Sequence, residues 1–346
     1  MKKSIMMGAA ILFCAVANAQ NSYTLNSIVT TTQDPHLVNP WGISRAASKS
    51  IGENQWWVSD NVTGYSTLYT ADGSSGGFNV IIPPAGTTGK GSPTGTASYT
   101  IGATNVNFAF VTLDGTISYW NSQTPPVKAG RSCAQCHTNA ATIMVNNSTT
   151  GASYQGLTIA KNATSGAMTF YAANANGGIE AYDAASFAPV TLTGTFTDPK
   201  VPKTYSPAGI QAIGSTIYVT YNAIAGGGRG FVDAYDTNGN LLLRIGTTAT
   251  LNQPWGVALA PAGFGQFSGS LLVGNTGNGV IGAYDATTGV FQGALENAAG
   301  KTIAIAGLWG IEFGNGSAQT GPTTVLYFAA GGPKLTTGTF GSITAN

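Results

Sequence analysis

Apolar and polar residues alternate along most of this chain in short runs, and glycine-containing turns separate the runs. In the clearest stretch, a Pro-Trp-Gly-Val turn at 254–257 is followed by an apolar run at 271–275 and by a Gly-Val-Ile-Gly-Ala-Tyr-Asp segment at 279–285. Alternation with a period of two residues is typical of β-strands, and glycine-rich breaks are typical of the turns between them. The pattern therefore predicts many short antiparallel strands joined by tight turns.

This arrangement recurs at a regular interval. Its lead glycines are Gly42, Gly156, Gly209, Gly256 and Gly310. They are about 50 residues apart, except that the first interval is about twice as long and holds a weaker copy at 107–120. Repeated units of this length with several short strands each are typical of propeller blades. We therefore expect an all-β fold, a six-bladed β-propeller of four-stranded antiparallel blades; a two-sheet sandwich and a parallel β-helix are the alternatives.

The two ends of the chain fit the same ring. The last unit stops after Thr-Phe-Gly-Ser-Ile at 339–343, one strand short of the others. An extended segment at 23–29, Tyr-Thr-Leu-Asn-Ser-Ile-Val, belongs to no unit of its own. Because an open sheet edge is a liability, we expect this N-terminal strand to close the last blade.

The first residues resemble a secretion signal. Lys2 and Lys3 precede an apolar stretch at 5–16, and Ala-Asn-Ala at 17–19 has the pattern of a cleavage site. We expect a signal peptide over 1–19, a single propeller domain over 20–346, and secretion to the periplasm or the exterior. Without Lys2 and Lys3, the mature chain is close to neutral.

Charged residues make up only 8% of the chain, against about 25% in an average soluble domain, while 43% of the residues are hydrophobic. A low charge without a basic surface argues against nucleic acid as a partner. Beyond the N-terminus no run approaches the roughly 18 apolar residues that a membrane-spanning helix requires, so no transmembrane segment is expected.

The repeat resembles a known kind of propeller unit. The Pro-x-Gly turn, the apolar run and the Asn-Gly-x-Ile-x-x-Tyr-Asp hairpin are similar to NHL-type repeats. The segments Asp-Pro-His-Leu-Val-Asn-Pro-Trp-Gly-Ile at 34–43 and Trp-Val-Ser-Asp-Asn at 57–61 resemble the opening of a family of secreted bacterial six-bladed propellers of unknown function. The resemblance implies the fold and the location, and it implies no activity.

The segment at about 121–140, in blade two, departs from that family. It contains Cys133, Cys136 and His137 in a Cys-x-x-Cys-His motif. This spacing is the pattern for covalent c-type haem, in which both thiols form thioethers and the adjacent histidine is the proximal ligand of the iron. The motif predicts haem c as a cofactor, and electron transfer to a redox partner as the function of the propeller that carries it. Met144 and His36 are the candidate distal ligands, although Met144 also fits a strand residue that faces the core.

Other interpretations of the cysteines remain open. Cys133 and Cys136 are the only cysteines of the mature chain, and a disulfide between them would pin a surface loop without a cofactor. A zinc site would need a second pair of ligands, and the chain has only two histidines. With the disulfide, the protein would be a non-catalytic propeller that binds a protein or glycan partner.

Polar residues also recur where each apolar run ends, near the expected central channel. They are Asp60, Asn174, Asn222 and Asn275. Some six-bladed propellers of related superfamilies are calcium-dependent lactonases, so a metal-dependent, lactonase-like hydrolase is a further alternative. A hard cation prefers several carboxylates, however, and this set has one. Hydrogen bonding within the blade turns is the favoured explanation of the asparagines.

Tryptophan recurs at the position before the lead glycine, as Trp41, Trp255 and Trp309. An indole offers a flat face and an N–H donor, so these residues are candidates for stacking on a sugar at the channel rim. Their equivalent spacing also fits packing between blades. The sequence thus predicts a binding or scaffold protein, with electron transfer through a haem or recognition of a partner or glycan at one rim as its role.

Overall fold

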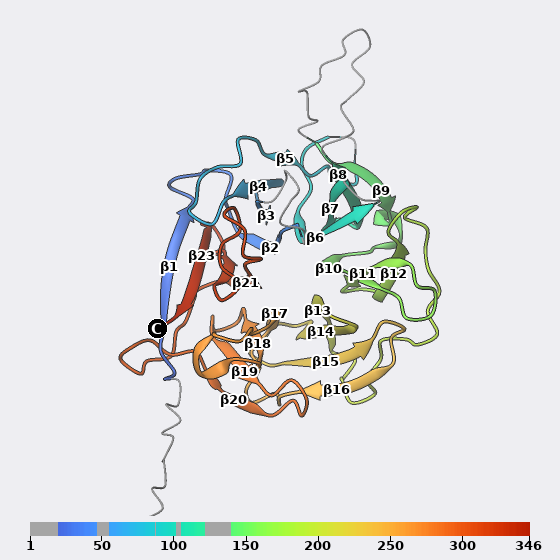
Figure 1. The fold of residues 1–346 in the computed structure, drawn as a ribbon. Coiled ribbons are helices and arrows are strands. Elements are labelled where there is room, and N and C mark those ends of the chain that lie inside the picture. The colour runs from blue at the N-terminus through green and yellow to red at the C-terminus, as the bar shows by residue number, and fades with distance from the viewer. Residues whose placement is uncertain (1–19, 47–54, 87, 102–104, 122–139) are drawn as a thin grey trace, which may run out of the picture.

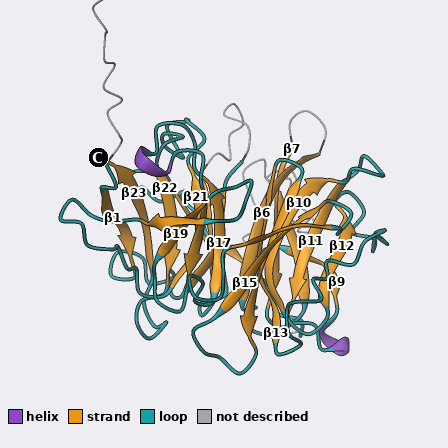
Figure 2. Cartoon of the chain, turned by 90° about the horizontal axis from the view of Figure 1, so that it is seen from below, coloured by secondary structure: helices purple, strands orange, loops and turns teal. Residues whose placement is uncertain are grey.

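The strands form a closed ring of six antiparallel sheets around a central axis (Figure 1). The computed structural model describes residues 20–46, 55–86, 88–101, 105–121 and 140–346. Seen from the side, the strands run between two faces that carry the loops (Figure 2). This arrangement confirms the six-bladed β-propeller that the repeats predict. The predicted signal peptide and the cysteine motif at 133–137 lie outside the described residues.

The blades follow one another in chain order, each starting with its innermost strand. Blade one has β2 (Pro40–Ser44), β3 (Trp56–Asp60), β4 (Tyr65–Tyr69) and β5 (Val80–Ile81), and blade two has β6 (Pro93–Ile101), β7 (Asn105–Thr112), β8 (Thr116–Asn121) and β9 (Thr142–Asn146). Blade three has β10 (Tyr154–Lys161), β11 (Met168–Asn174) and β12 (Gly178–Asp183), and blade four has β13 (Tyr205–Ile213), β14 (Thr216–Ala223), β15 (Gly230–Asp236) and β16 (Leu241–Ile245). Blade five has β17 (Pro254–Leu259), β18 (Leu271–Asn275), β19 (Ile281–Tyr284) and β20 (Phe291–Ala294), and blade six has β21 (Leu308–Phe313), β22 (Leu326–Ala330), β23 (Thr339–Ala345) and β1 (Tyr23–Thr30).

Blade six joins the two ends of the chain. β1 pairs antiparallel with β23, from Tyr23 opposite Ala345 to Thr30 opposite Thr339. Tyr23 is almost fully buried, and its hydroxyl donates a hydrogen bond to the carbonyl of Phe264 in blade five. The expectation that an N-terminal strand closes the last blade is therefore confirmed.

Blade three differs from the others, because its sheet has three strands in the described structure. In place of a fourth strand, residues 189–196, which we call the strap, touch β12 through one bridge between Tyr182 and Pro189. The N–H of Val190 donates to the carbonyl of Ala181, and after that point the strap leaves the edge of the sheet. Repeat counting predicts four full strands here and does not predict this exception.

The core consists of layers between neighbouring blades. Trp56 and Trp57 are consecutive in β3 and point to opposite faces of blade one. Trp56 packs against Tyr327 of blade six, with ring centroids 4.8 Å apart, and Trp57 stacks on Phe108 of blade two at 3.9 Å. Because both faces of such a strand are buried, its residues are apolar or small without strict alternation.

The helical content of the described chain is limited to two 3-10 turns, Ser148–Thr150 and Gly265–Phe267. No helix in this part of the chain has the length and apolar character needed to cross a membrane.

Candidate functional site

The innermost strands of all blades converge on the propeller axis, and a glycine of each lies at the closest approach. The six are Gly42, Gly95, Gly156, Gly209, Gly256 and Gly310. A Cβ on Gly42 would lie 2.6 Å from the carbonyl oxygen of Thr94, and one on Gly310 would lie 2.7 Å from that of Trp41. Each glycine thus packs directly on the backbone of the next blade. Gly95 was not recognised in the sequence, because the weak copy at 107–120 contains only the second and third strands of blade two.

This glycine ring closes the middle of the channel almost completely. The space enclosed there is about 20 Å³, which holds about one water molecule. No larger ligand fits at this level, so the two ends of the channel are separate environments.

At one end, the indoles of Trp41, Trp255 and Trp309 fill the channel. Trp41 stacks on Trp309 with ring centroids 3.7 Å apart, and Trp255 meets both rings edge to face at 6.4 and 6.1 Å. Each residue is only 8% exposed, and the Trp309 N–H donates to the Oδ1 of Asn39. We call this cluster the indole plug. Its ring faces contact one another, which leaves little indole surface for a sugar to stack on.

The polar residues at the ends of the second strands lie beside this plug, and they hold turns together. Asn174 accepts a hydrogen bond from the N–H of Ser153, and Asn275 accepts one from the N–H of Asn252. With its amide nitrogen toward the next blade, Asn222 donates to the carbonyl of Pro254 at 3.2 Å. The amides of Asn174 and Asn275 therefore hold the entry segments of their own blades, and only that of Asn222 reaches the next blade.

Asp60 is the one carboxylate of that set, and it is completely buried. Its Oδ2 accepts a hydrogen bond from the N–H of Thr67, while Oδ1 has no partner among the described residues. Burial raises the pKa of Asp60 well above its ordinary value, and the nearby charge of Asp34 raises it further. Two further carboxylates, Glu180 and Asp233, lie on the third strands β12 and β15 in separate hydrogen-bond networks.

The opposite end of the channel widens into a cavity of about 240 Å³, which we call the mouth cavity. Its walls are the residues that follow the ring glycines in the inner strands of blades one, two, three, four and six. The polar members are Ser44, Arg45, Thr96, Ser98, Thr158, Gln211 and Glu312, and the apolar members include Ile43, Leu157 and Ile159. Sequence reasoning found the glycines and missed these residues, which occupy the positions one to three residues after each glycine.

Opposite charges face each other in this cavity. The Nε of Arg45 lies 3.5 Å from the Oε1 of Glu312 and donates to the carbonyl of Phe313 at 2.7 Å. Burial raises the pKa of Glu312, and the Arg45 guanidinium opposes that rise. Gln211 bonds only weakly, through a 3.3 Å contact to the carbonyl of Ala212. Within the described structure, three groups are thus without strong protein partners. They are the terminal guanidinium nitrogens of Arg45, one carboxylate oxygen of Glu312 and the side-chain amide of Gln211.

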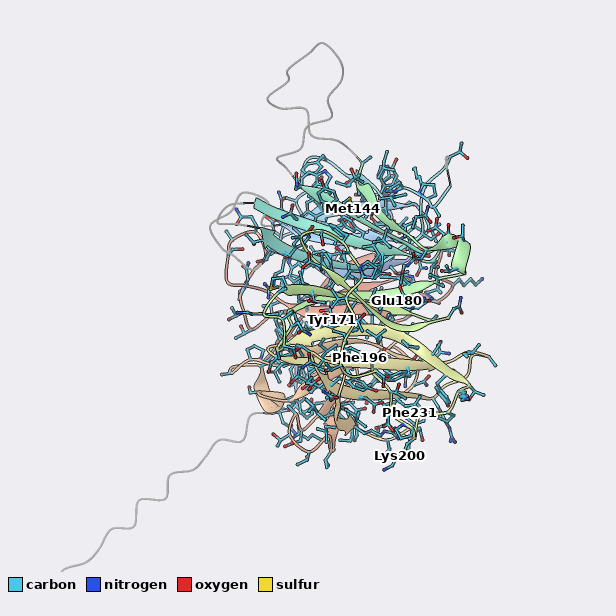
Figure 3. All side chains as sticks on the ribbon, turned by 90° about the vertical axis from the view of Figure 1, so that its right-hand side faces the viewer. Met144, Tyr171, Glu180, Phe196, Lys200 and Phe231 are labelled. Carbon is cyan, nitrogen blue, oxygen red and sulfur yellow. The ribbon has the colours of Figure 1, made fainter. Side chains whose placement is uncertain are left out.

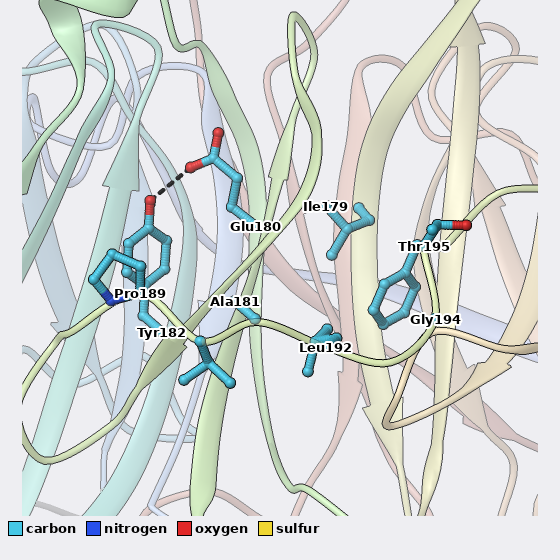
Figure 4. A pocket seen from close by; sticks show the side chains of 10 residues that line it. Ile179, Glu180, Ala181, Tyr182, Pro189, Leu192, Gly194 and Thr195 are labelled. Carbon is cyan, nitrogen blue, oxygen red and sulfur yellow. Dashed lines mark hydrogen bonds between the residues drawn. The ribbon is translucent and has the colours of Figure 1, made fainter.

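A second and larger cavity, of about 330 Å³, lies at the outer edge of blade three (Figure 4). We call it the blade-three cavity. It is bounded by Ile179, Glu180, Ala181 and Tyr182 of β12 and by the strap, whose Val190, Leu192 and Phe196 are apolar. Figure 3 places Glu180 and Phe196 on the same outer side of the molecule.

Glu180 is held by a network of hydroxyl and amide donors. Tyr154 and Tyr182 each donate to its Oε2 at 2.6 Å, and Asn174 donates to its Oε1 at 2.7 Å. Burial alone would raise the pKa of this carboxyl, but the hydrogen bonds outweigh burial and the pKa is lowered. Glu180 is therefore ionised at neutral pH.

The predicted axial ligands lie on different blades. Met144 is on β9, the outermost strand of blade two, and it is 41% exposed (Figure 3). The interpretation of Met144 as a core-facing residue is wrong, since Ile143 and Val145 take the partly buried positions of β9. The side chain of His36 contacts Asp34 at 3.1 Å and the edge of Tyr65 near blade one. Cys133, Cys136 and His137 lie outside the described residues, so the haem and the disulfide both stay predictions.

Within the described ranges, no three side chains of His, Cys, Asp or Glu come together in a group that could hold a metal ion.

Comparison with known sequences finds viral relatives. An uncharacterized protein of Acanthamoeba polyphaga mimivirus is 29% identical over 300 residues, which cover 80% of this chain and 69% of the viral protein. A second uncharacterized protein of that virus is 28% identical over 357 residues, which cover 95% and 86% of the two chains. No known family model matches. The similarity to NHL-type and bacterial propellers therefore stays a prediction from the motifs.

Comparison with solved structures finds the same architecture. A glucose dehydrogenase is similar with a TM-score of 0.56 and 12% identity, over 93% of this chain and 100% of the other. Virginiamycin B lyase from Staphylococcus aureus is similar with a TM-score of 0.51 and 15% identity, over 93% and 99%. At such low identity the likeness supports the propeller fold alone, because one fold can carry many activities.

Proposed function

We propose that this protein binds a small, neutral, hydroxyl-rich molecule, such as a mono- or disaccharide, in the mouth cavity. One observation carries the proposal: polar side chains from five of the six blades converge on a cavity at a widened end of the channel. Ligand sites are typically concave, with a few polar groups that fix orientation among apolar walls.

The charges of the cavity favour a neutral ligand. A simple anion drawn to Arg45 would face Glu312, and a simple cation drawn to Glu312 would face Arg45, since the two groups are 3.5 Å apart. A hydroxyl group both donates and accepts hydrogen bonds, so adjacent hydroxyls can serve the guanidinium and the carboxylate together. Gln211 adds a further donor and acceptor.

The shape of the channel favours binding over passage. The glycine ring and the indole plug close the channel behind the cavity, so a ligand enters and leaves through the same mouth. Ile43, Leu157 and Ile159 provide apolar surface against which the carbon skeleton of a sugar can pack. A glycan site at this mouth lies opposite to the indoles that the sequence indicated.

The test is ligand-observed NMR, by saturation transfer, with D-glucose, D-galactose, L-arabinose and their disaccharides. We expect at least one of them to bind, and Gln211→Ala and Glu312→Gln to weaken that binding by about fivefold or more, because each removes a hydrogen bond to the ligand. Glu296→Gln removes the same charge outside the cavity and is the matched control. No binding of any of these sugars, or equal effects of Glu312→Gln and Glu296→Gln, would contradict the proposal.

A further inference from the structure

Blade three has an uncovered sheet edge. Each of the other five sheets has a fourth strand, whereas β12 is the last strand of its sheet in the described structure. The strap touches β12 only near Ala181 and Tyr182. Figure 4 shows why: the chain that carries Pro189, Leu192 and Gly194 crosses β12 instead of running along it.

The backbone of Ile179 points to this open edge. Along β12, the N–H of Asp183 and the carbonyl of Ala181 bond outward to the segment at 188–190, so alternate residues point their backbone groups away from β11. By the same alternation, the N–H and carbonyl of Ile179 point outward, and neither has a hydrogen-bond partner in the described part of the chain. Unpaired groups at a sheet edge are a template for an added strand.

An apolar cavity adjoins the open edge. The side chains of Ile179, Ala181, Val190, Leu192 and Phe196 belong to one apolar cluster on the blade-four side of β12. They line the blade-three cavity of about 330 Å³, which is large enough for an aliphatic side chain. A residue added opposite Ile179 would place its side chain on this same face, because paired residues share a face.

The other face of β12 carries a carboxylate. Glu180 alternates with Ile179 and Ala181, and no lysine or arginine occurs in residues 178–197, while Asp198 beyond them is paired with Arg244. Glu180 projects from this face and its Oε1 accepts only one hydrogen bond, from Asn174. Lys200, the first basic residue after this stretch, lies well apart from Glu180 in Figure 3. Charge complementarity therefore favours a cationic occupant.

We propose that the open edge of β12 binds an extended segment of a partner protein in which apolar and basic residues alternate. The segment adds a strand to blade three, its apolar residue opposite Ile179 enters the blade-three cavity, and the flanking basic residues lie beside Glu180. Strand addition of this kind takes its affinity from main-chain hydrogen bonds and its specificity from the pockets for alternate side chains. The site is separate from the mouth cavity.

The probe is a blocked pentapeptide of sequence KVKVK, titrated into the full-length ¹⁵N-labelled protein. We expect the largest amide shift changes at Ile179 and Ala181. The peptides EVEVE and KSKSK test the charge and the apolar residue, and each should bind at least about tenfold more weakly. Shift changes confined to other blades, or equal binding of KVKVK and EVEVE, would overturn the proposal.

Matched variants separate the local site from general charge attraction. Glu180→Gln should weaken KVKVK binding at least about fivefold, whereas Glu296→Gln should not. Leu192→Ala should weaken binding, whereas Leu242→Ala, on the exposed outer strand of blade four, should not. Because Glu180→Gln alters a buried network, the Leu192 pair provides the decisive comparison if that variant unfolds. Equal effects within the Leu pair would overturn the proposal.

Discussion

The ring glycines determine how closely the inner strands approach the axis. In each blade the missing side chain allows the strand to lie directly on the backbone of its neighbour, and this contact recurs around the whole ring. A methyl group would meet backbone atoms, which cannot rotate away as the end of a flexible side chain can. The glycines are thus required by the close packing of the strands, since none of the six has a positive φ angle that would itself call for glycine.

Gly42→Ala tests this role. The new Cβ would lie 2.6 Å from the carbonyl oxygen of Thr94 and 3.0 Å from the N–H nitrogen of Thr96. We expect the free energy of unfolding to fall by about 2 kcal/mol, in the range of overpacked cores. Urea denaturation followed by fluorescence measures the change. Gly86→Ala is the control, since nothing lies within 4 Å of a Cβ at that position, and an equal loss in both variants would contradict this role.

Residues of the candidate site differ in how far the sequence predicted them. Four of the glycines were recognisable because proline or tryptophan precedes them, and Gly156 because it starts a similar unit. Gly95 follows Pro93 in the same way, but it was missed because the weak copy was placed at 107–120, after the inner strand of blade two. The walls of the mouth cavity carry no common residue type. Arg45, Gln211 and Glu312 follow their glycines by two or three positions, and those places in other blades hold serine, threonine, alanine or larger apolar residues. Only the convergence of the strands makes such residues a group.

At the scale of elements, closure of the ring depends on β1. This strand has no blade of its own and is hydrogen-bonded along its length to β23. It also brings Tyr23 and Val29 into the apolar layers on the two sides of blade six. The sequence predicted this element because an extended segment stood outside the repeat and the last unit lacked a strand.

Removing β1 tests the closure. A chain that starts at Thr31 loses the pairing with β23 and the burial of Tyr23, and it exposes the edge of β23. We expect the melting temperature to fall by more than about 10 °C relative to a chain that starts at Gln20, because large buried side chains cost about 3 kcal/mol or more each when lost. Differential scanning calorimetry gives the answer. Equal melting temperatures would show that β23 is a sufficient edge without β1.

The strap shows where pattern reading fails at this scale. Its sequence alternates apolar Val190, Leu192 and Phe196 with exposed threonines, which is the pattern of a strand. Such alternation shows that the segment is extended, with one buried and one exposed face. An extended chain that crosses a sheet has the same alternation as a strand that pairs with it. Pairing depends on the path of the chain between blades three and four, which no local pattern encodes.

At the scale of the whole molecule, the ring is complete without residues 122–139. β8 and β9 flank this stretch, and they pair with each other from Thr116 opposite Asn146 to Tyr119 opposite Thr142. The Cys-x-x-Cys-His motif therefore lies in the sequence between the third and fourth strands of blade two, and these two strands are paired with each other. Loss of the motif should leave the propeller folded, so chemistry at the cysteines can be tested apart from folding.

The c-type haem predicted from Cys133, Cys136 and His137 gives the sharpest such test. In protein produced with a cytochrome c maturation system, we expect a pyridine haemochrome spectrum and a mass increase of one haem, because both thiols form thioethers. Cys136→Ala should abolish covalent haem while the melting temperature of the propeller stays within about 2 °C. If a disulfide forms instead, the mass will match the polypeptide less two hydrogens and no haemochrome will be seen. The strands on both sides of the motif, β8 and β9, pair with each other. This second result would therefore exclude haem-based electron transfer in blade two, and it would not affect the six-bladed ring.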